Sequence, residues 1–188
     1  AIYNAQQAPD YYYQTDKYSY TTNTSRLLNL FYKASNKSSY AITGLYVNDS
    51  SNDVFDQQGF KSDLSGDIYA RRNGYVQNSL LTTQFTGTNN FSERFKLKYA
   101  LGYSNITGST PDRVQNSFID NKNGSYTFLR FNSSDNHRFF ADLNEDDFSG
   151  NITADLFAKD KESAFKNIQF GFQGRWKNRT FNSRQIET

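Results

Sequence analysis

Few residues in this 188-residue chain could carry chemistry. There is one histidine, His137, and no cysteine, so a Cys–His nucleophile and a His-rich metal site are excluded. A Ser–His–Asp triad would need His137, which stands in the polar stretch NSSDNHRFF and which we interpret as an exposed loop histidine. The carboxylates of NEDD at 144–147 are too unspecific to indicate acid–base catalysis. We therefore predict no enzyme, no catalytic residues and no cofactor.

The acidic stretch DLNEDDFSG begins like a calcium-binding loop, because Asp142, Asn144 and Asp146 fall at alternate positions. An EF-hand loop then needs glycine at its sixth position and glutamate at its twelfth. Those positions hold Asp147 and Thr153, so the EF-hand pattern fails. A looser calcium site built of oxygen ligands is the alternative to a solvated acidic loop, and we favour the loop.

Composition sets many aromatic rings among many polar residues. Aromatics make up 17% of the chain, with 14 Tyr and 17 Phe, yet the mean hydropathy is −0.84. Alternating strands produce this combination, and no apolar run is long enough for a transmembrane helix. A net charge of +2 is too mild to indicate a nucleic-acid partner. Because the chain lacks cysteine and methionine and begins at Ala1, we expect a processed or partial chain without disulfides.

The stretch SERFKLKYALGYSN at 92–105 alternates without a break between apolar and polar residues. Successive side chains of a strand point to opposite faces, so this strand has one apolar face and one basic face. Thirteen residues extend about 44 Å, or about 34 Å along an axis tilted by about 40°, which exceeds the roughly 25 Å apolar band of an outer-membrane barrel. In all we expect six long strands, near 22–34, 40–49, 68–87, 92–105, 148–158 and 165–181.

The expected connections alternate between short and long. Short polar turns are predicted at SNKSS, TNNFS and KDKES. Longer stretches at 1–21, 50–67 and 106–147 are predicted to be extracellular loops, because membrane barrels have short periplasmic turns and long outer loops.

Two Asn–Gly pairs indicate possible further turns within these strands and loops, since Asn–Gly favours two-residue hairpins. Within 106–147 we expect YTFLRF at 126–131 and HRFFADL at 137–143 to pair, with Asn123–Gly124 at a loop tip. Asn73–Gly74 would divide the third strand, but we keep that strand whole.

The faces of the strands leave two environments open. The last strand sets Ile168, Phe170, Phe172 and Trp176 opposite Asn167, Gln169, Gln173, Arg175 and Lys177, and the fifth sets Phe148, Ile152, Ala154 and Leu156 opposite Asn151, Thr153 and Asp155. The first strand carries apolar residues on both faces, namely Leu28, Leu30 and Tyr32 against Leu27 and Phe31, and the second mixes Ile42 and Tyr46 with Leu45 and Val47. A sandwich core explains these two strands as well as a barrel wall does.

Basic side chains would have to avoid lipid in the barrel interpretation, since a charge facing the midplane costs about 2–4 kcal/mol. We expect them to face the lumen, where we favour water or a plug over a transported solute as their partner. These residues are Arg94, Lys96, Lys98, Arg175 and Lys177.

The run YARRNGYVQNSLLTTQFTGTNNFSERFKLKYALGYSNITGSTPDRVQN resembles a segment of the TonB-dependent receptors of the outer membrane. The most specific similarities are YVQNSLL followed by Gln84 and Gly87, the alternating strand rich in aromatic residues, and PDRVQN at 111–116. NEDDFSGNITADLF and FGFQGRWKNRTFNSR resemble the family's pairing of an acidic start to one strand with an aromatic-rich return strand. The resemblance spans roughly residues 18–184.

What the resemblance implies is a barrel of 22 strands with a plug folded inside it, taking up a nutrient actively. Neither a plug nor a TonB-contacting box is recognisable here, and Thr188 does not end an aromatic strand. We therefore expect residues 1–188 to be an all-β, antiparallel slice of the barrel. Its partners would be outer-membrane lipid, the rest of the barrel, the plug, TonB through a missing N-terminal region, and a surface substrate-binding lipoprotein.

Two other functions stay open at this point. One is a soluble or cell-surface β-sandwich that binds carbohydrate through its tyrosines. The other is a small, complete outer-membrane barrel of six to eight strands that acts as an adhesin or a structural protein.

Overall fold

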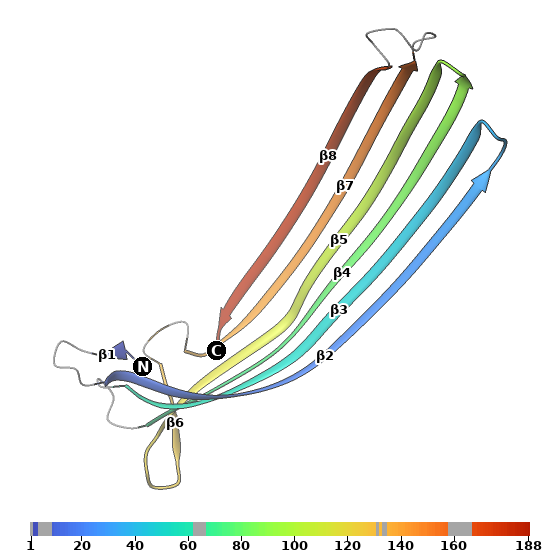
Figure 1. Cartoon of the computed structure of the whole chain (residues 1–188). Helices are drawn as coiled ribbons and strands as arrows, with labels where there is room; N and C mark the ends of the chain where they lie inside the picture. The colour runs from blue at the N-terminus through green and yellow to red at the C-terminus, as the bar shows by residue number, and fades with distance from the viewer. Residues whose placement is uncertain (1, 4–8, 62–66, 131, 133–134, 158–166) are drawn as a thin grey trace.

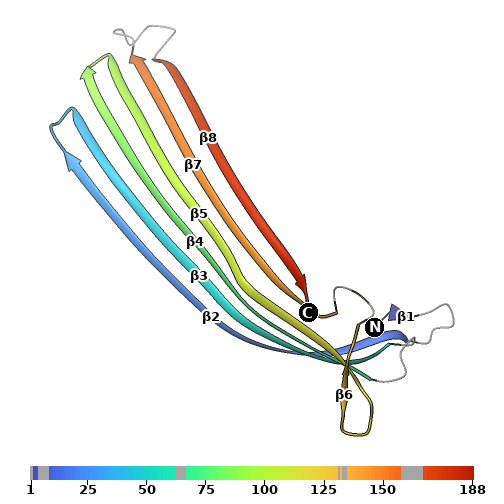
Figure 2. The same cartoon turned by 180° about the vertical axis from the view of Figure 1, so that it is seen from behind.

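The computed structural model describes residues 2–3, 9–61, 67–130, 132, 135–157 and 167–188. Within these ranges the chain is all-β and forms one antiparallel sheet (Figures 1 and 2). No helix in the described ranges has the length and hydropathy needed to span a membrane. The long strands are β2 (Pro9–Lys33), β3 (Ser38–Lys61), β4 (Asp67–Ser92), β5 (Phe95–Asp120), β7 (His137–Phe157) and β8 (Asn167–Glu187).

The sheet follows the order of the chain. Its strand order is β1-β2-β3-β4-β5-β7-β8, where β1 is the short strand Ile2–Tyr3, and the short strand β6 (Tyr126–Phe128) pairs with β5 off this path. Figure 1 shows the short turns at one end of the sheet, with both termini and β6 at the other end. The predicted all-β, antiparallel character and the six long strands are confirmed.

The predicted strand limits and loops are wrong, because every long strand runs further than its alternation indicates. Most of 1–21 belongs to β2, and 50–61 belongs to β3. The stretch 106–147 holds the end of β5 and the start of β7. These extensions mix polar residues with scattered aromatic and aliphatic ones on both faces, so they lack the regular apolar–polar alternation that marks a strand in a sequence, while their backbone pairing continues.

The short turns are close to the expected ones. Residues 34–37 connect β2 to β3 and overlap the predicted SNKSS at 35–39. The turn between β4 and β5 is only Glu93–Arg94, so TNNFS lies inside β4 rather than in a turn. KDKES lies outside the described residues.

The expected hairpin between 126–131 and 137–143 does not form. Instead β6 pairs with the end of β5, with Phe118 opposite Phe128, while 137–143 begins β7. Asn123–Gly124 does lie at the tip, where Lys122 (φ 58°) and Gly124 (φ 83°) take left-handed conformations. Glycine adopts that region readily, which explains the turn. Asn73–Gly74 lies inside the continuous strand β4, as we kept it.

A bulge bends the sheet at Pro111–Asp112. The register of β5 shifts against β4 between Gly74 and Gln77 and against β7 between Thr110 and Arg113, so β5 holds one extra residue relative to each neighbour. Proline cannot donate to a ladder and is found in sheets at bulges or edges, and a bulge bends its strand. Figure 1 shows β5 bending along its length. The PDRVQN motif therefore begins at the bulge of β5.

Gly74 makes room for this bulge. A Cβ atom at Gly74 would lie 2.9 Å from Cγ of Arg113, whose guanidinium carbon lies 4.5 Å from the ring centre of Phe139. A larger residue at position 74 would displace the arginine from that ring. We infer that glycine is needed here for the close approach of a neighbouring side chain.

Candidate functional site: an apolar band backed by a charged face

The register assigns every side chain of the sheet to one of two faces. Phe85 lies opposite Leu101, Leu101 opposite Gly150, and Gly150 opposite Gly174, so these four residues share a face that we call the band face. Lys98 points the other way, onto what we call the charged face. The face assignments made above for β7 and β8 are thereby confirmed.

The band face carries a continuous apolar stripe across the six long strands. It contains no charged residue over 28–32 of β2, 40–46 of β3, 81–91 of β4, 95–103 of β5, 148–156 of β7 and 168–176 of β8. We call this stripe the apolar band. Nine residues of β5 extend about 27 Å, or about 21 Å along an axis tilted by about 40°, which is close to the roughly 25 Å band of outer-membrane barrels. Leu101 at its middle is 59% exposed and Phe172 is 75% exposed.

Aromatic residues border the apolar band on both sides. Away from the short turns, Tyr103 lies 4.7 Å from Phe148 and Phe148 lies 5.7 Å from Trp176 between ring centres, forming a row across β5, β7 and β8. Toward the turns, Phe91 and Phe95 stack at 5.5 Å. Rings with a polar tip suit the boundary between hydrocarbon and water, and membrane barrels carry such girdles.

Polar side chains begin directly beyond this row. The hydroxyl of Tyr103 donates to Oδ1 of Asp146 at 2.8 Å, and Nδ2 of Asn105 donates to the same oxygen at 3.0 Å. Beyond them on the band face of β5 and β8 come Thr107, Ser109, Asn178, Thr180 and Asn182. The apolar band thus has a sharp upper limit.

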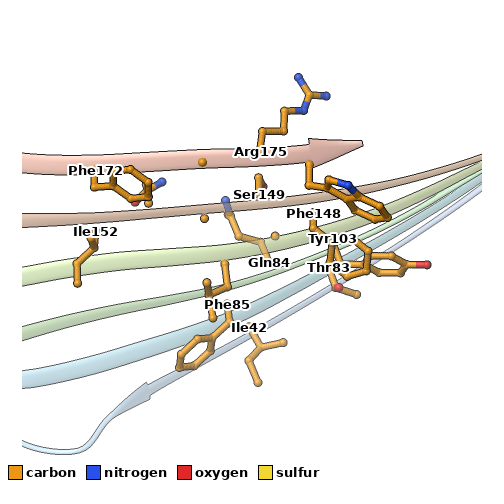
Figure 3. Close-up of a pocket in the computed structure, with 16 residues that line it drawn as sticks. Ile42, Thr83, Gln84, Phe85, Tyr103, Phe148, Ser149, Ile152, Phe172 and Arg175 are labelled. Atoms are coloured by element: carbon orange, nitrogen blue, oxygen red, sulfur yellow. The ribbon is translucent and has the colours of Figure 1, made fainter. Parts of the chain in front are cut away.

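A shallow hollow of about 860 Å³ lies within the apolar band. The adjacent residues Gly150 and Gly174 lower its floor, because neither has a side chain to fill the space. Figure 3 shows Ile42, Phe85 and Ile152 on the band face, with Arg175 directed to the other side. The lining on the band face is apolar apart from Thr83, the Tyr103 hydroxyl and the Trp176 indole N–H, so it has few polar groups that could orient a substrate.

The charged face carries ion pairs in which β7 supplies the carboxylates. Nζ of Lys98 on β5 lies 2.9 Å from Oδ2 of Asp155. On β8, Nζ of Lys177 lies 2.6 Å from Oε1 of Glu145, and Nε of Arg179 donates to Oε2 of the same carboxylate. From the sequence we expected water or a plug to be the partner of Lys98, Arg175 and Lys177. The structure instead gives them partners in their own sheet, with Nε of Arg175 at 2.9 Å from both oxygens of Asp147.

These cations shift the titration of the β7 carboxylates just beyond the apolar band. The hydrogen bond from Lys177, assisted by Arg179, holds the pKa of Glu145 below its usual value of 4.5. The hydrogen bond from Arg175 likewise holds the pKa of Asp147 below its usual value of 3.8. Each carboxylate therefore stabilises the folded sheet when it is ionised.

We expect the folded sheet to lose stability in acid. A carboxyl whose folded pKa is depressed contributes its full stabilisation above its unfolded pKa and loses it as the pH falls through the folded pKa. The urea concentration at the unfolding midpoint of the chain in detergent micelles should thus decrease as the pH is lowered past about 4.5. The decrease should be smaller in an Asp147→Asn variant. A midpoint that stays level or rises between pH 5 and 3 would contradict these pKa shifts.

The acidic stretch proposed above as a solvated loop is part of the extended strand β7. Asp142 and Asp146 lie on its band face, and Oδ1 of Asp142 accepts from the hydroxyl of Ser109 at 2.9 Å. Nδ2 of Asn105 donates to Oδ1 of Asn144 at 3.1 Å. Across the described ranges no group of three or more His, Cys, Asp or Glu side chains could hold a metal ion.

His137 is not the exposed loop residue that the sequence indicated. It is the first residue of β7 and is only 6% exposed, with its backbone between Gln115 of β5 and Glu187 of β8. Asn136, directly before it, is buried as well and accepts from the amide of Ser117 at 2.8 Å through its Oδ1. His137 is therefore part of a small packed region at this end of the sheet.

The sequence matches no family model and no curated protein. The resemblance to TonB-dependent receptors thus rests on the motifs quoted above. The structure places two of them: PDRVQN forms the bulge of β5, and YVQNSLL at 75–81 leads into the edge of the apolar band on β4.

Proposed function

We propose that this chain is part of the wall of a transmembrane β-barrel in the outer membrane of a Gram-negative bacterium. The band face lies against lipid, and the charged face lines the lumen. One observation carries the proposal: an uncharged apolar band of membrane height, bordered by aromatic rows, backs onto a face of ion pairs. Charges are tolerated inside a barrel and are costly on its lipid face, which fits this division.

Strand length favours a barrel wall over a soluble sandwich. The six long strands have 21–26 residues, whereas strands of soluble proteins have about 5–6. The apolar band covers only nine of the 26 residues of β5, and the remainder is largely polar on the band face too. A sandwich core would need an apolar inner face along most of each strand.

The edges of the sheet support membership of a larger barrel. Beyond β8 no strand pairs with its outer edge among the described residues, and β2 is covered on its outer edge only near Pro9 and Tyr11. Long open edges invite pairing or aggregation, and closure into a barrel removes them. Further strands on both sides would complete the wall.

The resemblance specifies which barrel this would be. A TonB-dependent receptor takes up a nutrient actively, so the chain would adjoin the rest of a 22-stranded barrel and a plug that TonB pulls on. A surface lipoprotein would deliver the substrate. In this arrangement the short turns face the periplasm, and the polar ends of β2–β5 rise above the outer leaflet.

Spin labels on neighbouring residues test the lipid-facing side. The chain has no cysteine, so Phe170→Cys and Gln169→Cys each give a single labelling site, on opposite faces of β8. In lipid bilayers the label at 170 should collide mainly with oxygen, and the label at 169 mainly with a water-soluble nickel chelate. Beyond residue 178, both faces should be accessible to nickel.

Two results would contradict the proposal. One is a label at 170 that is shielded from both oxygen and nickel, because that outcome indicates a dry core between two sheets. The other is a chain that folds as a stable monomer in water without detergent. The intact mass of the native polypeptide separates the two barrel hypotheses, since a value near 21.7 kDa fits a small complete barrel and a several-fold larger value fits a receptor.

A further inference from the structure

A second group of aromatic residues lies far from the apolar band. At the end of the sheet opposite the short turns, Tyr12, Phe60, Tyr69 and Tyr126 line a pocket of about 370 Å³ on the band face. Tyr69 precedes Leu81 of the apolar band by twelve residues, or about 41 Å of extended strand. These rings are therefore too distant to belong to the girdle that borders the apolar band.

Contacts within the sheet hold part of this pocket in place. The hydroxyl of Tyr69 donates to Oδ1 of Asp56 at 3.1 Å, and its ring stacks on Phe118 with ring centres 6.3 Å apart. Tyr126 meets both Tyr69 and Phe118 at 6.5 Å. Even so, Tyr126 stays 62% exposed and Tyr12 49% exposed. The structure thus presents rings that are partly fixed yet open to a ligand.

The polar lining of the pocket favours a ligand with many hydroxyl groups. Gln14 and Gln58 offer amides that can both donate and accept, and Asp67 and Asp120 offer carboxylates that accept from hydroxyls. Rings beside a few convergent polar groups are the lining expected of a small-molecule site. The apolar C–H face of a sugar ring can pack on tyrosine while its hydroxyls bond to these groups.

Charge narrows the class of ligand further. Asp56, Asp67 and Asp120 lie in or beside the pocket, and the nearest cations are already engaged. Nζ of Lys122 lies 3.8 Å from Oδ2 of Asp67, and Nε of Arg71 lies 3.3 Å from Oδ1 of Asp56. A phosphate or sulfate group would meet these carboxylates, so an anionic ligand is disfavoured.

We propose that this aromatic pocket binds a neutral oligosaccharide. The sugar has two possible sources, a soluble glycan or the polysaccharide of lipopolysaccharide. The inference goes beyond the barrel-wall proposal and does not depend on it, because the pocket is built from contacts outside the apolar band.

A printed array of oligosaccharides tests the proposal with the full chain in detergent micelles. The array carries neutral glucose, galactose and mannose oligosaccharides, a sulfated heparin hexasaccharide and the delipidated polysaccharide of lipopolysaccharide. Binding to neutral probes and not to heparin is expected. The affinity for the best probe should fall about tenfold in Tyr12→Ala and in Tyr126→Ala, as aromatic anchors of binding sites typically do when truncated. A preference for the lipopolysaccharide polysaccharide would assign the second source.

Tyr20→Ala is the matched control, because Tyr20 is an exposed tyrosine on the same face of β2, eight residues from Tyr12. It should bind like the unchanged chain, and far-ultraviolet circular dichroism should show that all three variants keep the sheet. The proposal is overturned if no neutral probe binds, if heparin binds best, or if Tyr20→Ala weakens binding as much as Tyr12→Ala.

Discussion

Arginine in place of Leu101 should lower the free energy of unfolding in lipid by about 2–4 kcal/mol, the penalty for arginine at the midplane of a barrel's lipid face. Leu101 lies at the centre of the nine band residues of β5 and is 59% exposed. A guanidinium there would have to leave water for hydrocarbon. The first polar groups that it could contact on the same face of β5 are those of Tyr103 and Asn105. Urea titration of the chain folded in lipid vesicles measures the change.

Two matched variants make this expectation specific. Asn105→Arg lies on the same face but beyond the aromatic row, where the penalty falls to about 0–1 kcal/mol. Ala100→Arg neighbours Leu101 but points to the charged face, opposite Asn151 and Thr86, and should also stay within about 1 kcal/mol. Equal losses at positions 100 and 101 would mean that both faces are packed, which contradicts a lumen on one side.

Sequence reasoning located the parts of the sheet where the two faces differ. In β5 and β8 the apolar band alternates with polar residues, and alternation identifies both the strand and its faces. The structure also shows where the apolar residues on the two faces of β2 lie. Leu28 and Leu30 lie in the apolar band, while Leu27 and Phe31 lie on the other face and are 71% and 68% exposed.

The polar halves of the strands could not be found in the same way. Beyond Tyr103 and Trp176, both faces are mostly polar with only scattered apolar residues such as Ile106 and Phe181, so no hydrophobic periodicity marks the strands, although they continue to Asp120 and Glu187. Their strand structure is set by pairing with a neighbour, which a single sequence does not display. The polar stretches were consequently taken for loops.

The charged face was missed for a related reason. Its carboxylates lie in β7 and its cations in β5 and β8, more than 25 residues away in sequence, as with Glu145 and Lys177. Only the register of three neighbouring strands brings them together. The available signal was the acidic run NEDD beside a return strand carrying Arg175, Lys177 and Arg179 at alternate positions. That spacing places all three cations on one face.

Glu145 should be the most sensitive member of these ion pairs. Its side chain is 2% exposed and meets both Lys177 and Arg179, whereas that of Asp147 is 11% exposed and meets Arg175. Glu145→Gln leaves Lys177 and Arg179, which are 41% and 59% exposed, side by side on one face of β8 without the anion that attracts both of them. The urea midpoint in detergent micelles should therefore fall further in Glu145→Gln than in Asp147→Asn.

A double-mutant cycle measures how much of that loss comes from the ion pair between Glu145 and Lys177. Adding Lys177→Gln to Glu145→Gln removes one of the two charges that the glutamate had neutralised. The double variant should then be more stable than the sum of the two single losses indicates, which is the signature of residues in one network. Additive losses would show that Glu145 acts through packing alone, and the ion pairs of the charged face would then contribute little to holding β7 against β8.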